Sequence, residues 1–386
     1  GSVIIGHYAG DAINTNNSNG SVLIGYQAGT SMTSGINTYI GYDAGRYSTT
    51  GAYNTALGYT AFDSATQLSK NTAVGYSALG AMSGSAGDTL NTAVGYIAGT
   101  AVTTGTHNTI VGANSGNTIN TGAYNTIMGA ETAISLADGS YNNIIGRRAG
   151  YSLTSGAYNT ALGSTALYSN QTGQGSVGVG QSAGYSFTGG GGVFMGYEAG
   201  HGVASGDVVF IGYQSGKRAR GTGNTAMGYG SLYGADSTAA NNTGTSNTAI
   251  GQNTLRWFSK TIGSTAVGAE AGYYTTGSYN TFMGYKAGHG GITSAPYSTG
   301  THNVAIGYLA MTSFTTAASN VAVGVNSADA LTTGDNTVAI GKHALSNEDV
   351  GNRTTAVGSQ ALAQQNTATA GITGNVGLGY GAGYYN

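Results

Sequence analysis

The chain of 386 residues contains no cysteine, a single proline (Pro296) and few charged residues. The absence of cysteine excludes disulfides, thiolate metal sites and cysteine nucleophiles. Charged residues make up 7% of the chain and the formal net charge is −2, so there is no electrostatic footprint for nucleic acid or for an anionic membrane. Apolar runs are too short for a spanning helix, and no membrane insertion is expected in this segment.

Glycine, in contrast, is abundant, with 70 residues, and its placement follows a short repeat. The repeated phrase is clearest as NTALG, NTAVG and NTAIG, and its final glycine recurs 22 times, most often at intervals of 17 residues. Gly58, Gly75 and Gly95 are three of these anchoring glycines, each taken as position 0 of a coil. A fixed short period predicts a stacked solenoid, because one repeat cannot bury its apolar face alone.

The residues before each glycine predict a β-strand. Position −1 is aliphatic in all 22 coils, and position −3 is Val or Thr in all except the coil of Asn143. The two positions share one face at strand periodicity, and we expect that face to fill the interior. Position −2 is also apolar, so we expect the other face to be covered by a second copy of the chain.

Other positions of the coil predict ladders and a bend. Position −4 is Asn in 14 coils, among them Asn54, Asn71 and Asn91, which suits either an amide ladder or a turn former. Position +1 is Tyr eleven times, and stacking of these rings is favoured over a sugar-binding platform. Tyr59, Tyr76 and Tyr96 belong to this set. Small residues at +3, often followed by Gly at +4, predict a bend into a second short strand.

The phrase VAIG at Val304–Gly307 and Val338–Gly341 resembles the N-x-V-A-I-G head repeat of trimeric autotransporter adhesins (YadA-like heads). The NTAVGYxAG form is similar to repeats of phage and virus tail fibres and of large bacterial surface proteins. The resemblance covers essentially the whole chain and implies a left-handed parallel β-roll in which three chains pack side by side. The preferred coil here is longer than the family's usual one.

Titratable residues give no catalytic or metal pattern. The acidic residues at position +2 are Asp43, Glu131, Glu198 and Glu270, and no two lie on neighbouring coils. A glycosidase needs two carboxylates within about 5 to 10 Å, or one to two coil steps. Glu131 precedes Arg148, and Glu270 precedes Lys286, at the same position one coil later, which predicts exposed ion pairs. The six histidines show no metal-ligand spacing. We therefore predict no catalytic residue, no cofactor and no metal site.

Two short segments depart from the repeat. Lys217, Arg218 and Arg220 form a dense basic cluster, and the only Trp lies in the segment Arg256–Trp257–Phe258. One interpretation is a solvated turn together with a residue that covers a groove of a neighbouring chain. The other is a contact site for a glycan or a protein partner.

These features predict an all-β fold, a parallel β-solenoid or β-roll of about 22 coils with a modal 17 residues per coil. We expect residues 1–386 to form a single repeat domain, to associate as a homotrimer, and to be part of a longer fibre. The predicted function is non-enzymatic: an extracellular structural or adhesive fibre, viral tail fibre or bacterial surface adhesin, that presents or forms an attachment element for a host-cell or surface glycan or protein receptor. An ice-binding solenoid is the alternative; it requires an exposed Thr lattice, whereas Thr55 and Thr72 are predicted to be buried. A tailspike-like glycan-degrading enzyme is a weaker alternative, because the carboxylate pair is missing.

Overall fold

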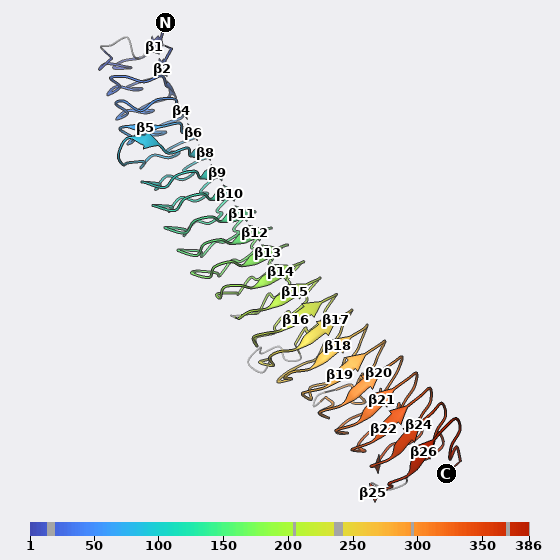
Figure 1. Ribbon diagram of the computed structural model, residues 1–386. Coiled ribbons are helices and arrows are strands. Elements are labelled where there is room, and N and C mark those ends of the chain that lie inside the picture. The colour runs from blue at the N-terminus through green and yellow to red at the C-terminus, as the bar shows by residue number, and fades with distance from the viewer. Residues whose placement is uncertain (14–19, 204–205, 235–241, 295–296, 368–370, 386) are drawn as a thin grey trace. The chain divides into compact units, whose positions relative to one another are not determined.

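The computed structural model describes residues 1–13, 20–203, 206–234, 242–294, 297–367 and 371–385. These residues contain strands and turns and no helix. The chain divides into two compact units, Gly1–Gly191 and Gly192–Asn386. Each unit is a stack of short coils, and each coil contributes one strand of three residues (Figure 1).

The strands recur at the predicted places before each anchoring glycine. In the first unit they are β1 (Val3–Ile5), β2 (Val22–Ile24), β3 (Thr38–Ile40), β4 (Thr55–Leu57), β6 (Thr72–Val74), β8 (Thr92–Val94), β9 (Thr109–Val111), β10 (Thr126–Met128), β11 (Asn143–Ile145), β12 (Thr160–Leu162) and β13 (Val177–Val179). In the second unit they are β14 (Val193–Met195), β15 (Val209–Ile211), β16 (Thr225–Met227), β17 (Thr248–Ile250), β18 (Thr265–Val267), β19 (Thr281–Met283), β20 (Val304–Ile306), β21 (Val321–Val323), β22 (Val338–Ile340), β24 (Thr355–Val357) and β26 (Val376–Leu378).

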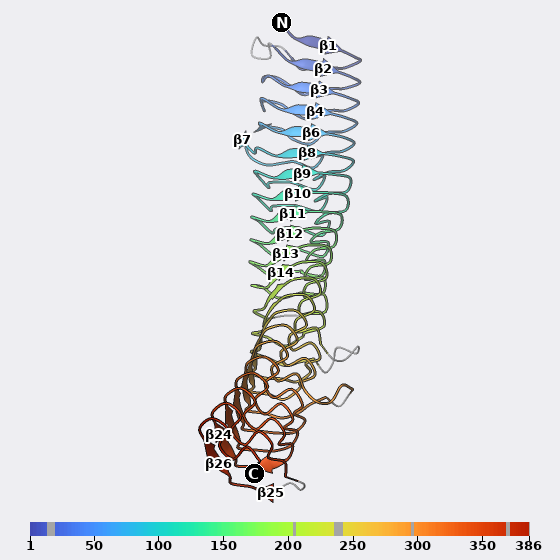
Figure 2. The same cartoon turned by 90° about the vertical axis from the view of Figure 1, so that its right-hand side faces the viewer.

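Successive strands pair in parallel and without any shift in register. In β3 and β4, Tyr39 lies opposite Ala56 and Ile40 opposite Leu57, and the strands of the first unit lie one beneath another in Figure 2. Two small two-stranded pairs form in longer coils, β5 (Leu68–Ser69) with β7 (Gly87–Asp88) and β23 (Gly351–Asn352) with β25 (Gly371–Ile372). The predicted all-β parallel β-solenoid of about 17 residues per turn is confirmed.

Backbone hydrogen bonds between coils continue through the turns as well as the strands. The amide of Asp43, at position +2, donates to the carbonyl of Tyr26 in the preceding coil at 2.9 Å. The amide of Gly45, at position +4, donates to the carbonyl of Ala61 in the following coil at 2.9 Å. Each coil is therefore bonded to both neighbours, and its backbone polar groups are satisfied despite the absence of long strands.

The anchoring glycines are required by both conformation and space. Gly58 has a φ of +143°, a region that L-residues with side chains rarely adopt. A Cβ atom at Gly58 would also collide with the carbonyl of Gly75 in the next coil. The same clash recurs between successive anchors along both units. A residue with a side chain at this position would therefore prevent the coils from stacking this closely.

The expectation about which strand face lies inside is wrong. Residues at position −2, such as Tyr39 and Ala56, are completely buried, whereas those at −3 and −1 point outward and are half-buried or exposed. Leu57, for example, is 46% exposed. The −2 side chain, whether Ala or a ring, fills the interior, while the aliphatic residue at −1 lies on the outside in every coil.

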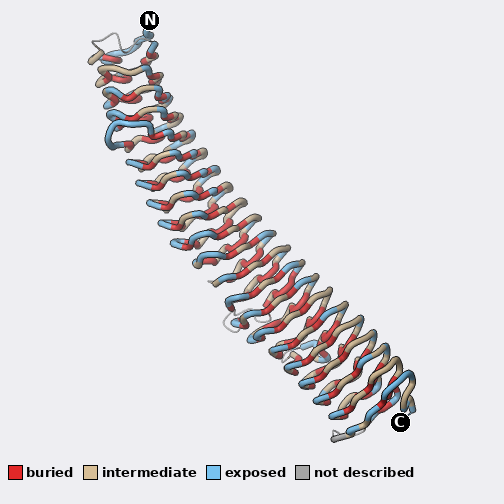
Figure 3. The backbone as a smooth tube through the Cα atoms, viewed as in Figure 1, coloured by how far each residue is buried: buried red, intermediate tan, exposed pale blue. Residues whose placement is uncertain are grey.

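The interior volume is shared in most coils between positions −2 and +4. Where −2 is large, +4 is small and usually Gly, as with Tyr39 and Gly45; where −2 is Ala, +4 is often large, as with Ala56 and Phe62. A Cβ at Gly45 would lie 2.6 Å from the ring of Tyr39. The two side chains therefore compete for one space, and buried residues recur at the same places in successive coils (Figure 3).

The predicted second short strand after position +4 is also wrong for most coils. The backbone has positive φ at +2 and at +4, for example +54° at Asp43 and +58° at Gly45, and such a path forms turns rather than an extended strand. The chain instead places a further core residue at position +7. Met32, Leu153 and Phe258 occupy this position and are fully or almost fully buried.

The asparagines at position −4 form the amide ladder that was one of two expectations for them. The side-chain oxygen of Asn54 accepts hydrogen bonds from the backbone amide and from the side chain of Asn71 at 3.0 and 3.2 Å. The side-chain nitrogen of Asn54 donates to the carbonyl of Leu68 at 2.8 Å. Asn71 and Asn91 continue the ladder. These buried amides satisfy backbone groups that the strands leave unpaired.

Replacing Asn54 with Ala should lower the free energy of unfolding by about 2 to 4 kcal/mol, because two buried backbone groups lose their partners. Asn54→Ser should cost clearly less, since the hydroxyl of Ser264 accepts from the amide of Asn280 at 3.1 Å at the same position of another coil. Urea unfolding followed by circular dichroism measures both variants. Equal losses for Ala and Ser would show that the ladder does not stabilise the stack in this way.

Candidate functional site

The outer face of the sheet, defined as positions −3 and −1 of every coil, is uncharged and has an aliphatic column at −1. Its residues are Thr or Val at −3 with one Asn, and Ile, Leu, Val or Met at −1. Several of the aliphatic side chains are well exposed, including Leu57 at 46%, Met128 at 42% and Met283 at 46%. Exposed aliphatic surfaces of this kind mark interaction sites in soluble proteins.

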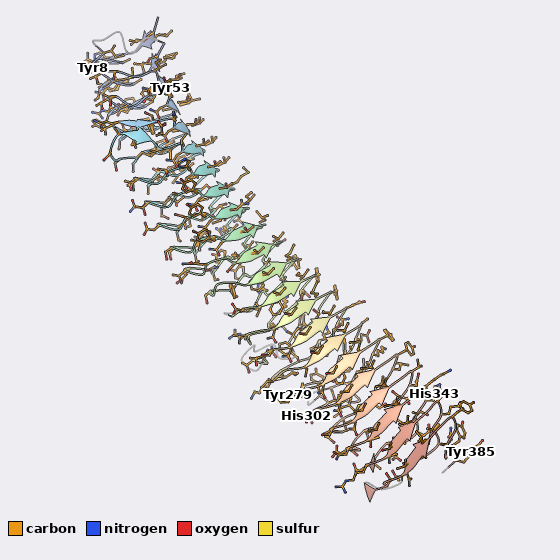
Figure 4. All side chains as sticks on the ribbon, viewed as in Figure 1. Tyr8, Tyr53, Tyr279, His302, His343 and Tyr385 are labelled. Carbon is orange, nitrogen blue, oxygen red and sulfur yellow. The ribbon has the colours of Figure 1, made fainter. Side chains whose placement is uncertain are left out.

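Ladders of stacked tyrosines run beside the outer face at position +1. Tyr26, Tyr42, Tyr59, Tyr76 and Tyr96 stack with ring centroids 4.9 to 5.3 Å apart. Tyr197, Tyr213 and Tyr229 form a second ladder, in the second unit. Position −5 carries further stacks, such as that of Tyr279 with His302 (Figure 4). The rings cover one another's faces and present their edges to solvent.

A second surface, the cation–tyrosine cluster, consists of Lys217, Arg218, Tyr233, Arg256 and Trp257 in the second unit. The charged groups of Lys217, Arg218 and Arg256 lie 6.0, 5.3 and 4.6 Å from the centre of the Tyr233 ring. Arg256 also lies 5.6 Å from the Trp257 ring. Cations at such distances from aromatic rings are attracted by the negative ring faces. The two basic segments singled out in the sequence are therefore one surface.

Aromatic stacking extends the cluster along the solenoid. Trp257 stacks on Tyr297 with centroids 5.8 Å apart, and Tyr297 stacks on Tyr274 at the same distance. Tyr297 belongs to the interval between Gly284 and Gly307, one of the two longest in the chain. Insertions in a solenoid emerge as loops that often form its binding surface. Here the described part of one insertion supplies a ring to the cluster.

The sequence prediction of contact residues needs two changes. Phe258 is completely buried at position +7 and belongs to the core, because this position of the coil points inward. Arg220 is exposed but is separated from Arg218 by the buried Ala219. The reasoning from sequence missed Tyr233. Counting residues from each anchoring glycine would have found it, since Lys217, Tyr233 and Arg256 all stand at position +5.

One acidic residue, Glu198, is paired with a cation of this surface. Glu198 accepts from Lys217 at 2.5 Å and from Gln214 at 2.7 Å. Burial raises the pKa of Glu198, and the hydrogen bonds from Lys217 and Gln214 outweigh that effect, so the pKa lies below its ordinary value. Lys217 is thus neutralised locally. The charges on Arg218 and Arg256 have no carboxylate against them among the residues that the structure describes.

The predicted opposite-charge pairs between neighbouring coils are present. Arg148 lies 2.5 Å from Glu131, and Lys286 lies 3.5 Å from Glu270. Both pairs are partly exposed, so water and salt screen them and each contributes little to stability.

Glu348 is a buried carboxylate whose hydrogen bonds hold a turn of the backbone. It occupies core position +7 and accepts from the amide of Gly351 and from Gln365, both at 2.7 Å, and from the hydroxyl of Thr367. Burial raises its pKa, but these hydrogen bonds lower it overall. Every contact serves to hold the local turn, because all the donors come from the same and the next coil.

Asp63 is a carboxylate held in an unfavourable setting. Burial and the nearby charge of Asp43 raise its pKa to about 6, although Arg46 acts in the opposite direction. Arg46 is itself engaged with Asp43 at 3.3 Å. One oxygen of Asp63 is buried without a hydrogen-bond partner.

Within the described ranges, no group of three or more metal-ligating side chains comes together. The described part of the chain also contains no helix long and apolar enough to cross a bilayer. The sequence matches no protein-family model, and no curated protein matches it.

Because the native state holds the Asp63 proton more tightly than the unfolded chain does, its ionisation destabilises the fold. The native pKa of about 6 exceeds the ordinary value of 3.8, so stability is lost as pH rises through 6. Asp63→Asn should raise the urea midpoint relative to the parent at pH 7, and the difference should disappear by about pH 4, where the parent aspartic acid is neutral. A difference that does not change with pH would contradict this assignment.

Proposed function

We propose that this chain is a structural fibre whose coils associate side by side with other copies through the outer face of the sheet. The observation that carries this proposal is the uncharged surface at positions −3 and −1, with its partly exposed aliphatic column at −1. Position −1 is aliphatic in every coil, and no solvent-facing role requires such uniformity. A partner that excludes water from this surface would gain the hydrophobic free energy of its burial.

The area of the outer face supports a stable interface. Eleven coils at about 4.8 Å each give a length near 50 Å in either unit. The columns from −3 to +1 cover a width of about 14 Å, which makes roughly 700 Å². Stable protein interfaces bury about 800 Å² on each partner, so the face in one unit is close to that size before the +1 tyrosines add their side-chain surface.

The spacing of the coils favours a second copy of the chain as the partner. The aliphatic side chains form one ridge per coil, and such a surface packs best against another with ridges at the same spacing. A second copy of the chain has that spacing because its coils are the same. We propose three chains, because the repeat resembles the head repeat of trimeric adhesins. The proposed assembly is an extracellular homotrimeric fibre, on a virion or a bacterial surface, that presents or forms an attachment element for a host or surface receptor.

Lysines placed on the outer face should dissociate the assembly. The double variant Leu57→Lys/Val94→Lys buries two charges in the proposed interface and should sediment as a monomer, whereas the parent should sediment as a trimer in analytical ultracentrifugation. The control Ser64→Lys/Gln67→Lys adds the same charge at exposed positions outside the outer face and should stay trimeric. A monomeric parent chain would refute the proposal.

Ice binding is a second candidate, because the threonines expected to be buried are on the outer face. Six consecutive coils carry Thr at position −3, and several of these residues are exposed. They are Thr38, Thr55, Thr72, Thr92, Thr109 and Thr126. The side chains of the neighbouring −1 column, however, differ in length, for example between Val111 and Met128. Asn143 and Val177 interrupt the Thr column. An uneven aliphatic column suits an interdigitating protein partner better than a planar crystal surface.

We therefore expect the parent chain to show no thermal hysteresis in nanolitre osmometry. The monomeric Leu57→Lys/Val94→Lys variant should show none either, although it exposes the whole Thr column. Thermal hysteresis that disappears on replacing Thr92 and Thr109 with bulky Tyr would favour ice binding over the fibre.

A further inference from the structure

The cation–tyrosine cluster carries positive charge that no carboxylate neutralises among the residues that the structure describes. Of its three cations, Lys217 is paired with Glu198, and Arg256 donates to the uncharged side chain of Asn253 at 2.8 Å. Arg218 contacts the Tyr233 ring. Two guanidinium groups on one ring repel each other, so their arrangement favours an anionic ligand, which would remove the repulsion.

The aromatic side chains hold these two arginines in fixed positions. Tyr233 stands on the coil of β16, Arg218 on the preceding coil and Arg256 on the following one. The guanidinium of Arg256 lies between two rings, 4.6 Å from the centre of Tyr233 and 5.6 Å from that of Trp257. Side chains already ordered in the free protein lose little conformational entropy when a ligand binds.

The separation of the arginines selects the ligand. Their coils are two steps apart, about 10 Å along the solenoid. The two guanidinium groups lie 5.3 and 4.6 Å from the centre of the Tyr233 ring, which limits their own separation to about the same value. A planar guanidinium donates two parallel hydrogen bonds to a carboxylate or a sulfate. Acid groups that occur once per disaccharide in a polysaccharide are spaced at a similar distance, so one chain of this type could place successive acid groups on both arginines.

The same geometry argues against a nucleic acid. Proteins that hold single strands offer open aromatic faces on which bases stack. Here one face of Trp257 stacks on Tyr297 and Arg256 lies over the ring, while Tyr297 stacks on Tyr274 as well as on Trp257. The ring faces are thus occupied by other rings and by an arginine, and a base would have to displace these contacts to stack on them.

We propose that Arg218 and Arg256, held by Tyr233 and Trp257, form a binding site for an acidic polysaccharide with one acid group per disaccharide. The site lies in the second unit and does not depend on the outer face of the sheet. It would give the fibre an attachment point on its side.

Titration calorimetry with hyaluronan octasaccharide tests the site, with a neutral dextran oligosaccharide and a single-stranded oligonucleotide as comparison ligands. The full parent chain should bind hyaluronan and not dextran, and added salt should weaken binding. Arg218→Gln/Arg256→Gln should raise the dissociation constant by roughly tenfold for each arginine. Arg218→Lys/Arg256→Lys should lose less, because it keeps both charges but not the paired donors.

The matched control is Arg147→Gln/Arg353→Gln, which removes the same charge from two exposed arginines outside the cluster. It should bind like the parent chain. Thermal melting of each variant shows whether it is folded. The proposal is overturned if the parent does not bind hyaluronan, if the control loses as much affinity as the cluster variant, or if the oligonucleotide binds more tightly than hyaluronan. Binding in a monomeric outer-face variant shows that the site stands apart from the proposed trimer.

Discussion

The hydrogen bonding of each coil to the coil above and below it is the constraint on which the rest of the structure depends. The bonds continue from the strands through the turns, so every position of the coil is held at one fixed rise. That rise leaves no room for a Cβ at the anchoring position, where Gly58 would collide with Gly75. It also brings equivalent side chains within contact, which turns asparagines, tyrosines and charged residues at fixed positions into ladders and pairs.

Function in this molecule is expected at departures from the repeat as well as in the repeat itself. The regular positions produce a long uncharged face with an aliphatic residue in every coil, which suits association with an equally regular surface. The irregular positions produce the cation–tyrosine cluster, where the described part of a long interval brings Tyr297 against Trp257. The two surfaces have different chemistry, since one is uncharged and aliphatic and the other combines guanidinium groups with aromatic rings.

The repeat made the architecture predictable, because period, strand position, the amide ladder and the Glu131–Arg148 pair all follow from counting residues. The interior face was not predicted correctly, since strand periodicity indicates which residues share a side but not which side is inside. The opposite sizes of Tyr39 and Gly45, and of Ala56 and Phe62, indicate that positions −2 and +4 share one interior space. This pattern is visible in the sequence and could have identified the inner face. The cluster was seen only as two separate segments, because a long interval hid the common position of Lys217 and Arg256 until the coils were aligned.

The compensation between positions −2 and +4 has a consequence for how such a chain changes over generations. In most coils a large residue at one of these positions is matched by a small one at the other, so the coil fills its own interior. A gene segment that encodes such a coil is therefore an interchangeable cassette, and recombination could duplicate or delete it with little packing defect at the new junction. A coil such as that of Ala93 and Gly99 differs, because Leu79 and Ile110 of its neighbours fill the space beside Gly99, and moving it would leave that space empty.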